Sequence, residues 1–110
     1  MSFSSHTTAE LFPYNMARVF AHVLKVLPEE GFAIKQIDEI ICRVIASTGL
    51  SMFSFGENIF ISLKRVDDEN TVMSIESKLK IFSLSGIPRN RKNIETIIFA
   101  VRKSIRFSDI

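Results

Sequence analysis

The sequence predicts an α+β fold in which two helices pack on one face of a four-stranded antiparallel sheet. Three observations lead to this prediction. Apolar residues recur with helical spacing in one segment near the start of the chain and in another near its end. Between these segments the spacing changes to two residues, which is typical of half-buried strands. The connections between those strands are short, which favours an antiparallel meander and the element order α-β-β-β-β-α.

The first helix is expected from about Pro13 to Leu27. Its apolar residues fall on one helix face, and they are Met16, Val19, Phe20, Val23, Leu24 and Leu27. Proline suits a first helical turn, where its missing N–H has no partner to lose, and Pro28 with Gly31 is expected to end the helix. The segment Thr7–Phe12 could add a short lead strand before the helix.

Four strands are expected between the two helices. They run over about residues 32–37, 40–47, 59–64 and 71–81, and the polar turn Asp67–Asn70 separates the last two. In the fourth strand, alternate residues point to opposite faces of the sheet. One face carries Met73, Ile75, Leu79 and Ile81, whereas the other carries Ser74, Glu76, Lys78 and Lys80.

The second helix is expected from about Asn90 to Arg106, after a break at residues 86–88. Its apolar stripe consists of Ile94, Ile97, Ile98, Val101 and Ile105. Arg102 and Lys103 lie near its end, where cations complement the helix dipole. Both apolar stripes are buried if the two helices cover the same face of the sheet.

Length and composition predict one globular domain, with residues 1–8 as a flexible tail. The 110 residues are 46% hydrophobic and 24% charged, and they include ten Phe and no Trp, which favours an apolar core or pocket. The single cysteine, Cys42, excludes an internal disulfide. A secretory signal pattern and an apolar run of membrane-spanning length are absent from the sequence, so a cytoplasmic location is expected.

The order of elements and four short segments resemble small uncharacterised bacterial domain families. In those families a helix precedes a four-stranded antiparallel meander and a second helix closes the chain. The similar segments are Gly31–Ile34, Gly56–Ile59, Thr71–Ile75 and Lys92–Glu95. The resemblance covers most of the chain from about Pro13 onward. It implies the architecture, and it supplies no catalytic residues to carry over.

We expect no catalytic, metal or cofactor site. His6 and His22 lack the spacing of a metal-binding pair, and no serine lies in a nucleophile elbow. Cys42 lies within a β-branched run and is expected to be a buried, inert thiol. The four glycines form neither a Walker loop nor a dinucleotide-binding fingerprint.

Two segments are candidate binding sites. Arg89, Arg91 and Lys92 stand at the start of the last helix, where cations oppose the dipole, and they could hold a phosphate, a carboxylate or an acidic loop. The alternative is an ordinary solvated surface. The segment Gly49–Gly56 is apolar where a polar turn is expected. It either extends the flanking strands or folds over the edge of the core, or it forms an exposed loop that meets a partner groove, a membrane surface or the rim of a lipid pocket. Its apolar residues are Leu50, Met52, Phe53 and Phe55.

The sheet face away from the helices is the third candidate. If Ile40, Cys42 and Val44 point inward, the opposite face of the sheet is more apolar than a solvent-facing surface should be. That face would carry Ile41, Arg43, Ile45, Phe60, Val66 and Val72. A second copy of the chain or another partner is expected to cover it.

Three functions follow from these features. The leading hypothesis is a non-catalytic binding or assembly module that forms homo-oligomers through Ile41, Ile45, Phe60 and Val72 on the open sheet face. The alternative is a carrier of a small apolar or lipid-like ligand, which the phenylalanines and the segment Gly49–Gly56 favour. The third is weak nucleic-acid or anion binding through the last third of the chain, where eight basic residues and two acidic ones follow residue 77. The overall charge of only +2 argues against nucleic acid as the partner.

Overall fold

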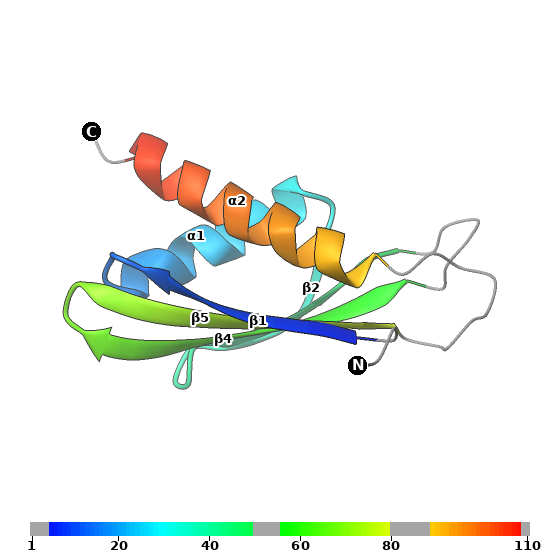
Figure 1. The fold of residues 1–110 in the computed structure, drawn as a ribbon, viewed down its shortest axis with the longest axis horizontal. Coiled ribbons are helices and arrows are strands. Elements are labelled where there is room, and N and C mark those ends of the chain that lie inside the picture. The colour runs from blue at the N-terminus through cyan, green and yellow to red at the C-terminus, as the bar shows by residue number, and fades with distance from the viewer. Residues whose placement is uncertain (1–4, 50–55, 80–88, 109–110) are drawn as a thin grey trace.

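A single antiparallel sheet is covered on one face by two helices (Figure 1). The structure is a computed structural model, and it describes residues 5–49, 56–79 and 89–108. Its elements are β1 (Ser5–Phe12), α1 (Met16–Glu29), β2 (Ala33–Asp38), β3 (Arg43–Ser47), β4 (Glu57–Asp67), β5 (Asn70–Leu79) and α2 (Asn90–Ser108). The strands lie in the order β1-β5-β4-β3-β2. The predicted α+β class, with both helices on one face of an antiparallel sheet, is therefore confirmed.

The sheet has five strands, one more than the four that were predicted. The segment expected only as a short lead strand is the eight-residue strand β1, which pairs with β5 from Ser5 opposite Lys78 to Phe12 opposite Thr71. Residues 5–8 therefore belong to the sheet and not to a flexible tail. The sequence under-predicted this strand because β1 lies at an edge of the sheet, and most of its residues are partly or fully exposed polar residues without an apolar alternation.

α1 begins at Met16, three residues later than predicted. The backbone of Asn15 is extended and non-helical, and its side-chain Oδ1 accepts a hydrogen bond from the N–H of Arg18 at 3.2 Å. This is the geometry of an N-cap, in which a side-chain oxygen serves one of the N–H groups that the first helical turn leaves without a partner. Pro13 therefore precedes the helix instead of starting it.

α1 continues through Pro28 to Glu29 and ends in a Schellman motif. The N–H of Phe32 donates to the carbonyl oxygen of Leu27 at 2.8 Å, and the N–H of Gly31 donates to the carbonyl oxygen of Pro28 at 3.1 Å. Gly31 adopts a φ of +89°, which only glycine reaches without steric strain. Gly31 thus ends the helix as predicted, whereas Pro28 lies inside its last turn.

β3 begins at Arg43, so residues 40–42 form a turn and not the start of a strand. Asp38 Oδ1 accepts hydrogen bonds from the N–H groups of Ile40 and Ile41 at 3.1 and 3.3 Å, which closes the turn. Ile40 is 94% exposed, so the prediction that it points into the core is wrong. Ile41 lies in the same turn, so it is not a residue of the open sheet face.

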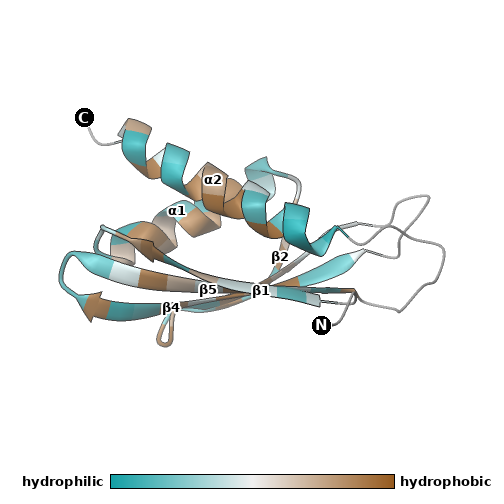
Figure 2. Ribbon diagram, in the orientation of Figure 1, coloured by the Kyte–Doolittle hydropathy of each residue, from teal (hydrophilic) through white to brown (hydrophobic). Residues whose placement is uncertain are grey.

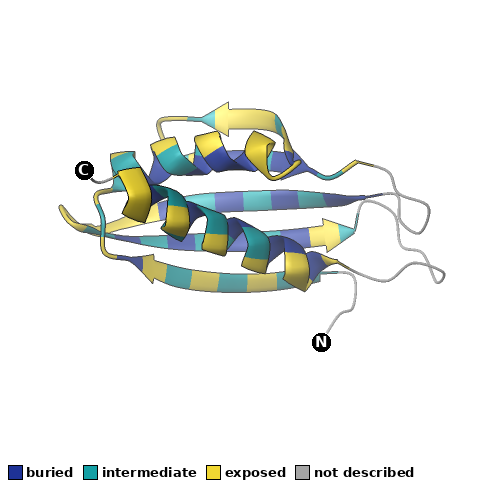
Figure 3. Ribbon diagram, turned by 90° about the horizontal axis from the view of Figure 1, so that it is seen from above, coloured by how far each residue is buried: buried dark blue, intermediate teal, exposed yellow. Residues whose placement is uncertain are grey.

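The hydrophobic core lies between the sheet and the two helices (Figure 3). The helices contribute Val19, Phe20, Val23, Val26, Leu27, Ile94, Ile97, Val101 and Ile105. The sheet contributes Val44, Ala46, Ile59, Ile61, Leu63, Met73 and Ile75. Apolar and polar segments alternate along α2 in Figure 2, as expected for an amphipathic helix. The predicted helical stripes therefore form the core, with Met16, Leu24 and Ile98 only partly buried at its edge.

Candidate functional site

Five polar side chains meet between the sheet and the start of α2. Thr48 follows β3, Glu57 begins β4, Ser77 lies in β5, and Asn90 and Asn93 lie in the first turn of α2. Thr48 is partly buried, and the other four are buried. We call these five residues the polar cluster. It places polar groups at one end of a layer whose other described buried side chains are apolar, apart from Ser47 and Thr71.

The positions of the polar cluster follow from the same periodicities that build the core. Glu57 and Ser77 occupy inward positions, each two residues from a buried isoleucine of the same strand. Asn90 and Asn93 each lie four residues before a buried isoleucine of α2, on the same helix face. Polar residues at inward-facing positions were thus the sequence signal for this site. None of the five residues was predicted as a candidate from the sequence.

Hydrogen bonds join the polar cluster from one side to the other. The N–H of Glu57 donates to Thr48 Oγ1 at 2.7 Å, and the Thr48 hydroxyl donates to Glu57 Oε1 at 3.4 Å. Asn93 Nδ2 donates to Glu57 Oε1 at 2.7 Å and to Ser77 Oγ at 3.3 Å. The Ser77 hydroxyl donates to Asn90 Oδ1 at 2.8 Å. These bonds offset much of the free energy that burying a carboxylate and two amides costs.

Positive charge also faces the Glu57 carboxylate. Arg89 Nε lies 3.8 Å from Glu57 Oε1, and the Arg89 side chain is partly exposed. Arg89 directly precedes α2, whose first N–H groups carry the positive end of the helix dipole. The carboxylate is therefore held by a guanidinium, an amide and a hydroxyl at the N-terminal end of a helix.

One donor of the polar cluster has no hydrogen-bond partner among the residues that the structure describes. Asn90 is only 3% exposed, and its Nδ2 makes no hydrogen bond. Turning the Asn90 side-chain amide over, so that its nitrogen and oxygen change places, does not pair every atom. Oδ1 would then have no partner, and the Ser77 hydroxyl would lose its acceptor. An unpaired buried donor costs about 1–3 kcal/mol. An acceptor atom on a bound molecule would remove this cost.

The three cations predicted to bind an anion have different surroundings. Arg89 faces the buried Glu57 carboxylate, and Arg91 Nε pairs with Glu95 Oε1 on the exposed side of α2 at 3.0 Å. Lys92 borders a surface hollow of about 530 Å³. Two of the three cations thus have carboxylate partners. Anion binding and nucleic-acid binding by this part of the chain stay predictions.

The open sheet face carries both apolar and polar side chains. Ile45 of β3 lies opposite Phe60 of β4, and Phe60 lies opposite Glu76 of β5. These residues border a hollow of about 360 Å³, together with Arg43, Ser62 and Ser74. Ser62 and Ser74 lie between Phe60 and the predicted Val72, so the face is not continuously apolar. The four apolar candidates Leu50, Met52, Phe53 and Phe55 lie outside the described residues.

A histidine joins the two helices. His22 Nδ1 lies 2.6 Å from Ser104 Oγ, and His22 Nε2 lies 3.2 Å from Ser108 Oγ. The Ser108 hydroxyl donates to the carbonyl oxygen of Ile105 at 3.1 Å, so it can only accept from the imidazole. We therefore assign the proton to Nε2, and Nδ1 accepts from the Ser104 hydroxyl.

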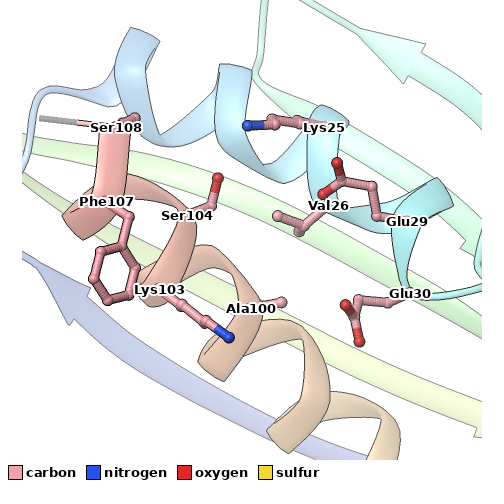
Figure 4. Close-up of a pocket in the computed structure, with 9 residues that line it drawn as sticks. All are labelled: Lys25, Val26, Glu29, Glu30, Ala100, Lys103, Ser104, Phe107 and Ser108. Carbon is pink, nitrogen blue, oxygen red and sulfur yellow. The ribbon is translucent and has the colours of Figure 1, made fainter.

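The surroundings of His22 favour its neutral form. Burial lowers the pKa of this imidazole, and the nearby charges of Lys25 and Arg18 lower it further. The neutral ring keeps the acceptor nitrogen that the Ser104 hydroxyl requires. Ser104 also lines a hollow of about 350 Å³ between the ends of α1 and α2 (Figure 4). We interpret the histidine and its serines as a contact that fixes the packing of the two helices.

Metal-ligand clusters and membrane-spanning helices are absent from residues 5–49, 56–79 and 89–108. No group of three or more His, Cys, Asp or Glu side chains in these ranges is placed to hold a metal ion. No helix there is both long and apolar enough to cross a bilayer.

Solved structures resemble the chain, whereas no protein-family model and no curated protein sequence matches it. A START superfamily protein from Mycobacterium smegmatis aligns with a TM-score of 0.63 at 6% identity, over 92% of this chain and 93% of that one. A putative uncharacterized protein from Bacillus thuringiensis aligns with a TM-score of 0.65 at 9% identity, over 92% and 98% of the two chains. The crystal structure of Ara h 8.0201 aligns with a TM-score of 0.63 at 12% identity, over 92% of this chain and 97% of that one.

These likenesses show the fold, which is START-like, and at such identities they show nothing further. The uncharacterised bacterial neighbour agrees loosely with the resemblance to small bacterial domain families. The polar cluster is therefore interpreted from its own chemistry.

Proposed function

We propose that this protein is a non-catalytic carrier of a small, mainly apolar molecule, which it holds by a hydrogen-bond acceptor at the polar cluster. The observation that carries the proposal is the unpaired Nδ2 of Asn90, buried beside a connected set of polar side chains. A START-like fold is compatible with this role, and it does not identify the ligand.

A binding role accounts for the polar cluster better than a stabilising role. Buried polar and charged groups are often no more stabilising than apolar residues of similar volume, because their desolvation offsets their contacts. Buried isoleucines flank the cluster on the strands and on α2, so further apolar residues would have extended the core without an unpaired donor. Polar residues at inward positions, where apolar residues are the rule, are expected at functional sites.

The proposed ligand has a neutral acceptor group on an apolar body. Asn90 offers an amide N–H and no positive charge, and the Glu57 carboxylate belongs to the same hydrogen-bonded network. Arg89 and the helix dipole already balance the Glu57 carboxylate, so a ligand carboxylate would be a second negative charge without a partner, whereas a ketone, ester or hydroxyl oxygen would add no charge. The isoleucines around the cluster favour an aliphatic or ring-containing body.

Replacing Asn90 with leucine is expected to weaken the binding of 2-nonanone by about five- to tenfold, because one buried hydrogen bond is lost. Isothermal titration calorimetry with 2-nonanone and nonanoate measures this effect, and the ketone is expected to bind more tightly than the carboxylate. The matched control is Asn58→Leu, the same change on the open face of β4. Thermal unfolding of both variants verifies that they fold.

The carrier proposal fails if wild type binds neither probe. It also fails if Asn90→Leu binds 2-nonanone as tightly as wild type does, since the amide would then make no contact with the ligand.

The second candidate function is assembly through the open sheet face. Phe60 and Ile45 form the apolar part of the hollow there, with Arg43 on β3 and Glu76 on β5 at opposite sides of β4. A two-fold axis through this hollow would bring Arg43 of each copy toward Glu76 of the other, which is the self-complementary pattern of an isologous dimer.

Replacing Phe60 with serine is expected to convert a concentration-dependent dimer into a monomer, because the apolar centre of the face is removed. Sedimentation velocity over a range of protein concentrations measures this change. Ile41→Ser is the control, because Ile41 lies in the β2–β3 turn beside the sheet face and its loss should leave the dimer intact. A wild-type protein that stays monomeric at its highest soluble concentration contradicts this candidate.

A further inference from the structure

The last turns of α2 expose aromatic rings on their outer surface. Phe99 and Phe107 are 69% and 66% exposed, although large apolar side chains are usually buried. Lys103 lies midway between them at a spacing of four residues, so the three side chains follow one another along the helix. Arg106 is exposed beside them. We call Phe99, Lys103, Arg106 and Phe107 the α2 ridge, and Figure 3 shows this helix from its outer side.

The α2 ridge carries positive charge without bound carboxylates. Arg102 is held by its neighbours, since its Nη2 lies 3.6 Å from a Glu10 carboxylate oxygen and its guanidinium lies over the Phe12 ring. Among the residues that the structure describes, neither Lys103 nor Arg106 forms an ion pair. A hollow of about 280 Å³ lies between the two phenyl rings and these cations.

Apart from Glu10 of β1, which pairs with Arg102, the acidic groups near the α2 ridge are Glu29, Glu30 and Glu95. Glu29 and Glu30 at the end of α1 border the hollow that Figure 4 shows, which Lys103 also borders. Glu95 is paired with Arg91. Of the six basic residues between positions 89 and 108, Arg89, Arg91 and Arg102 lie near carboxylates, which leaves Lys92, Lys103 and Arg106 as the positive charges of this surface. The outer surface of α2 therefore presents a positive field with two apolar rings in it.

We propose that the α2 ridge docks this protein on the surface of an anionic lipid membrane. Aromatic rings on a helix surface enter the boundary between head groups and acyl chains, while adjacent lysine and arginine side chains contact anionic head groups. A stable protein partner would require a much larger complementary patch, with paired polar groups at its edge. Two rings and two unpaired cations fit a shallow, reversible membrane contact. The docking inference rests on the proposed function only to explain why docking would be useful, because a carrier of apolar molecules exchanges them with membranes.

Vesicle co-sedimentation tests this docking with the full chain. Wild type is expected to bind vesicles of mixed phosphatidylglycerol and phosphatidylcholine, to bind phosphatidylcholine vesicles weakly, and to dissociate as salt is raised. The double variant F99S/F107S is expected to bind the mixed vesicles at least about tenfold more weakly, because two apolar groups are lost. The double variant K103Q/R106Q is also expected to lose roughly tenfold or more.

The controls make comparable changes outside α2. I40S removes an exposed apolar side chain from the β2–β3 turn, and K64Q/K78Q removes two exposed cations from the open sheet face. Both should bind the mixed vesicles as wild type does. Docking by the α2 ridge is overturned if wild type does not bind, if neutral vesicles bind equally well, or if the controls lose as much binding as the ridge variants.

The same samples separate this inference from the carrier proposal. If F99S/F107S lowers the assembly mass and vesicles do not bind, the ridge is a contact between copies of the chain and the docking inference is wrong. Vesicle binding without 2-nonanone binding would remove the carrier proposal and leave docking supported. Binding of 2-nonanone that F99S/F107S retains, without any vesicle binding in wild type, would remove docking alone.

Discussion

Replacing Glu57 with alanine is expected to lower the free energy of unfolding by about 3 kcal/mol. The carboxylate is fully buried and accepts hydrogen bonds from Asn93 Nδ2 and from the Thr48 hydroxyl. Its removal takes the strongest acceptor from Asn93 Nδ2, which keeps only the longer bond to Ser77 Oγ, and the Arg89 guanidinium loses its counter-charge. Urea unfolding, followed by circular dichroism, measures the change.

Two variants separate the buried network from a general loss of charge. Glu57→Gln keeps the side-chain shape and one acceptor oxygen, so its expected cost is smaller, about 1–2 kcal/mol. Glu69→Ala removes an exposed carboxylate in the β4–β5 turn, and its expected effect lies within about 0.5 kcal/mol. A cost below about 1 kcal/mol for Glu57→Ala would mean that the polar cluster contributes little to the fold.

Replacing Gly56 with alanine is expected to cost about 2–4 kcal/mol, because strain and steric contact act together. Gly56 adopts a φ of +96°, in the region that side chains disfavour. A Cβ at this position would lie 2.7 Å from the carbonyl oxygen of Thr48 and 3.0 Å from that of Gly49. Since Gly56 directly precedes Glu57, any shift of this backbone also displaces the polar cluster.

Gly31→Ala is the matched control for this substitution. Gly31 has a similar φ of +89°, but a Cβ there would meet nothing within 4 Å. Its expected cost is therefore the conformational penalty alone, about 1–2 kcal/mol. The difference in unfolding free energy between the two alanine variants measures the backbone contact at Gly56. Equal costs would show that Thr48 moves aside without strain.

Periodicity predicted the faces of the main elements because burial of one face imposes a pattern that the sequence must carry. Val19, Ile97 and Met73 were each assigned to the side that the structure buries. The same pattern under-predicted β1, since an edge strand with a mostly polar sequence has little apolar alternation. Ile40 was placed wrongly, because Asp38 closes a turn through side-chain hydrogen bonds that apolar patterning does not register.

The candidate site was less predictable than the fold. Glu57 and Ser77 could have been recognised as polar residues at inward positions, and Asn90 and Asn93 as polar residues on the buried face of α2. That these four side chains meet in space could not have been predicted from the sequence. Their meeting depends on the register of β4 against β5, which sets Ile59 opposite Ser77, and on where α2 crosses the sheet.

By itself, the sequence determined the α+β class, the two helices, most of the strands and the apolar faces that build the core. These properties are local, because each follows from the repeat of side chains along a single segment. Only the tertiary structure decided that β1 completes the sheet, that five polar groups from two strands, the residue after a third strand and a helix share hydrogen bonds, and that Asn90 keeps an unpaired donor. Those outcomes depend on register and helix placement, which are set by packing between segments far apart in the chain and leave no pattern within any one of them.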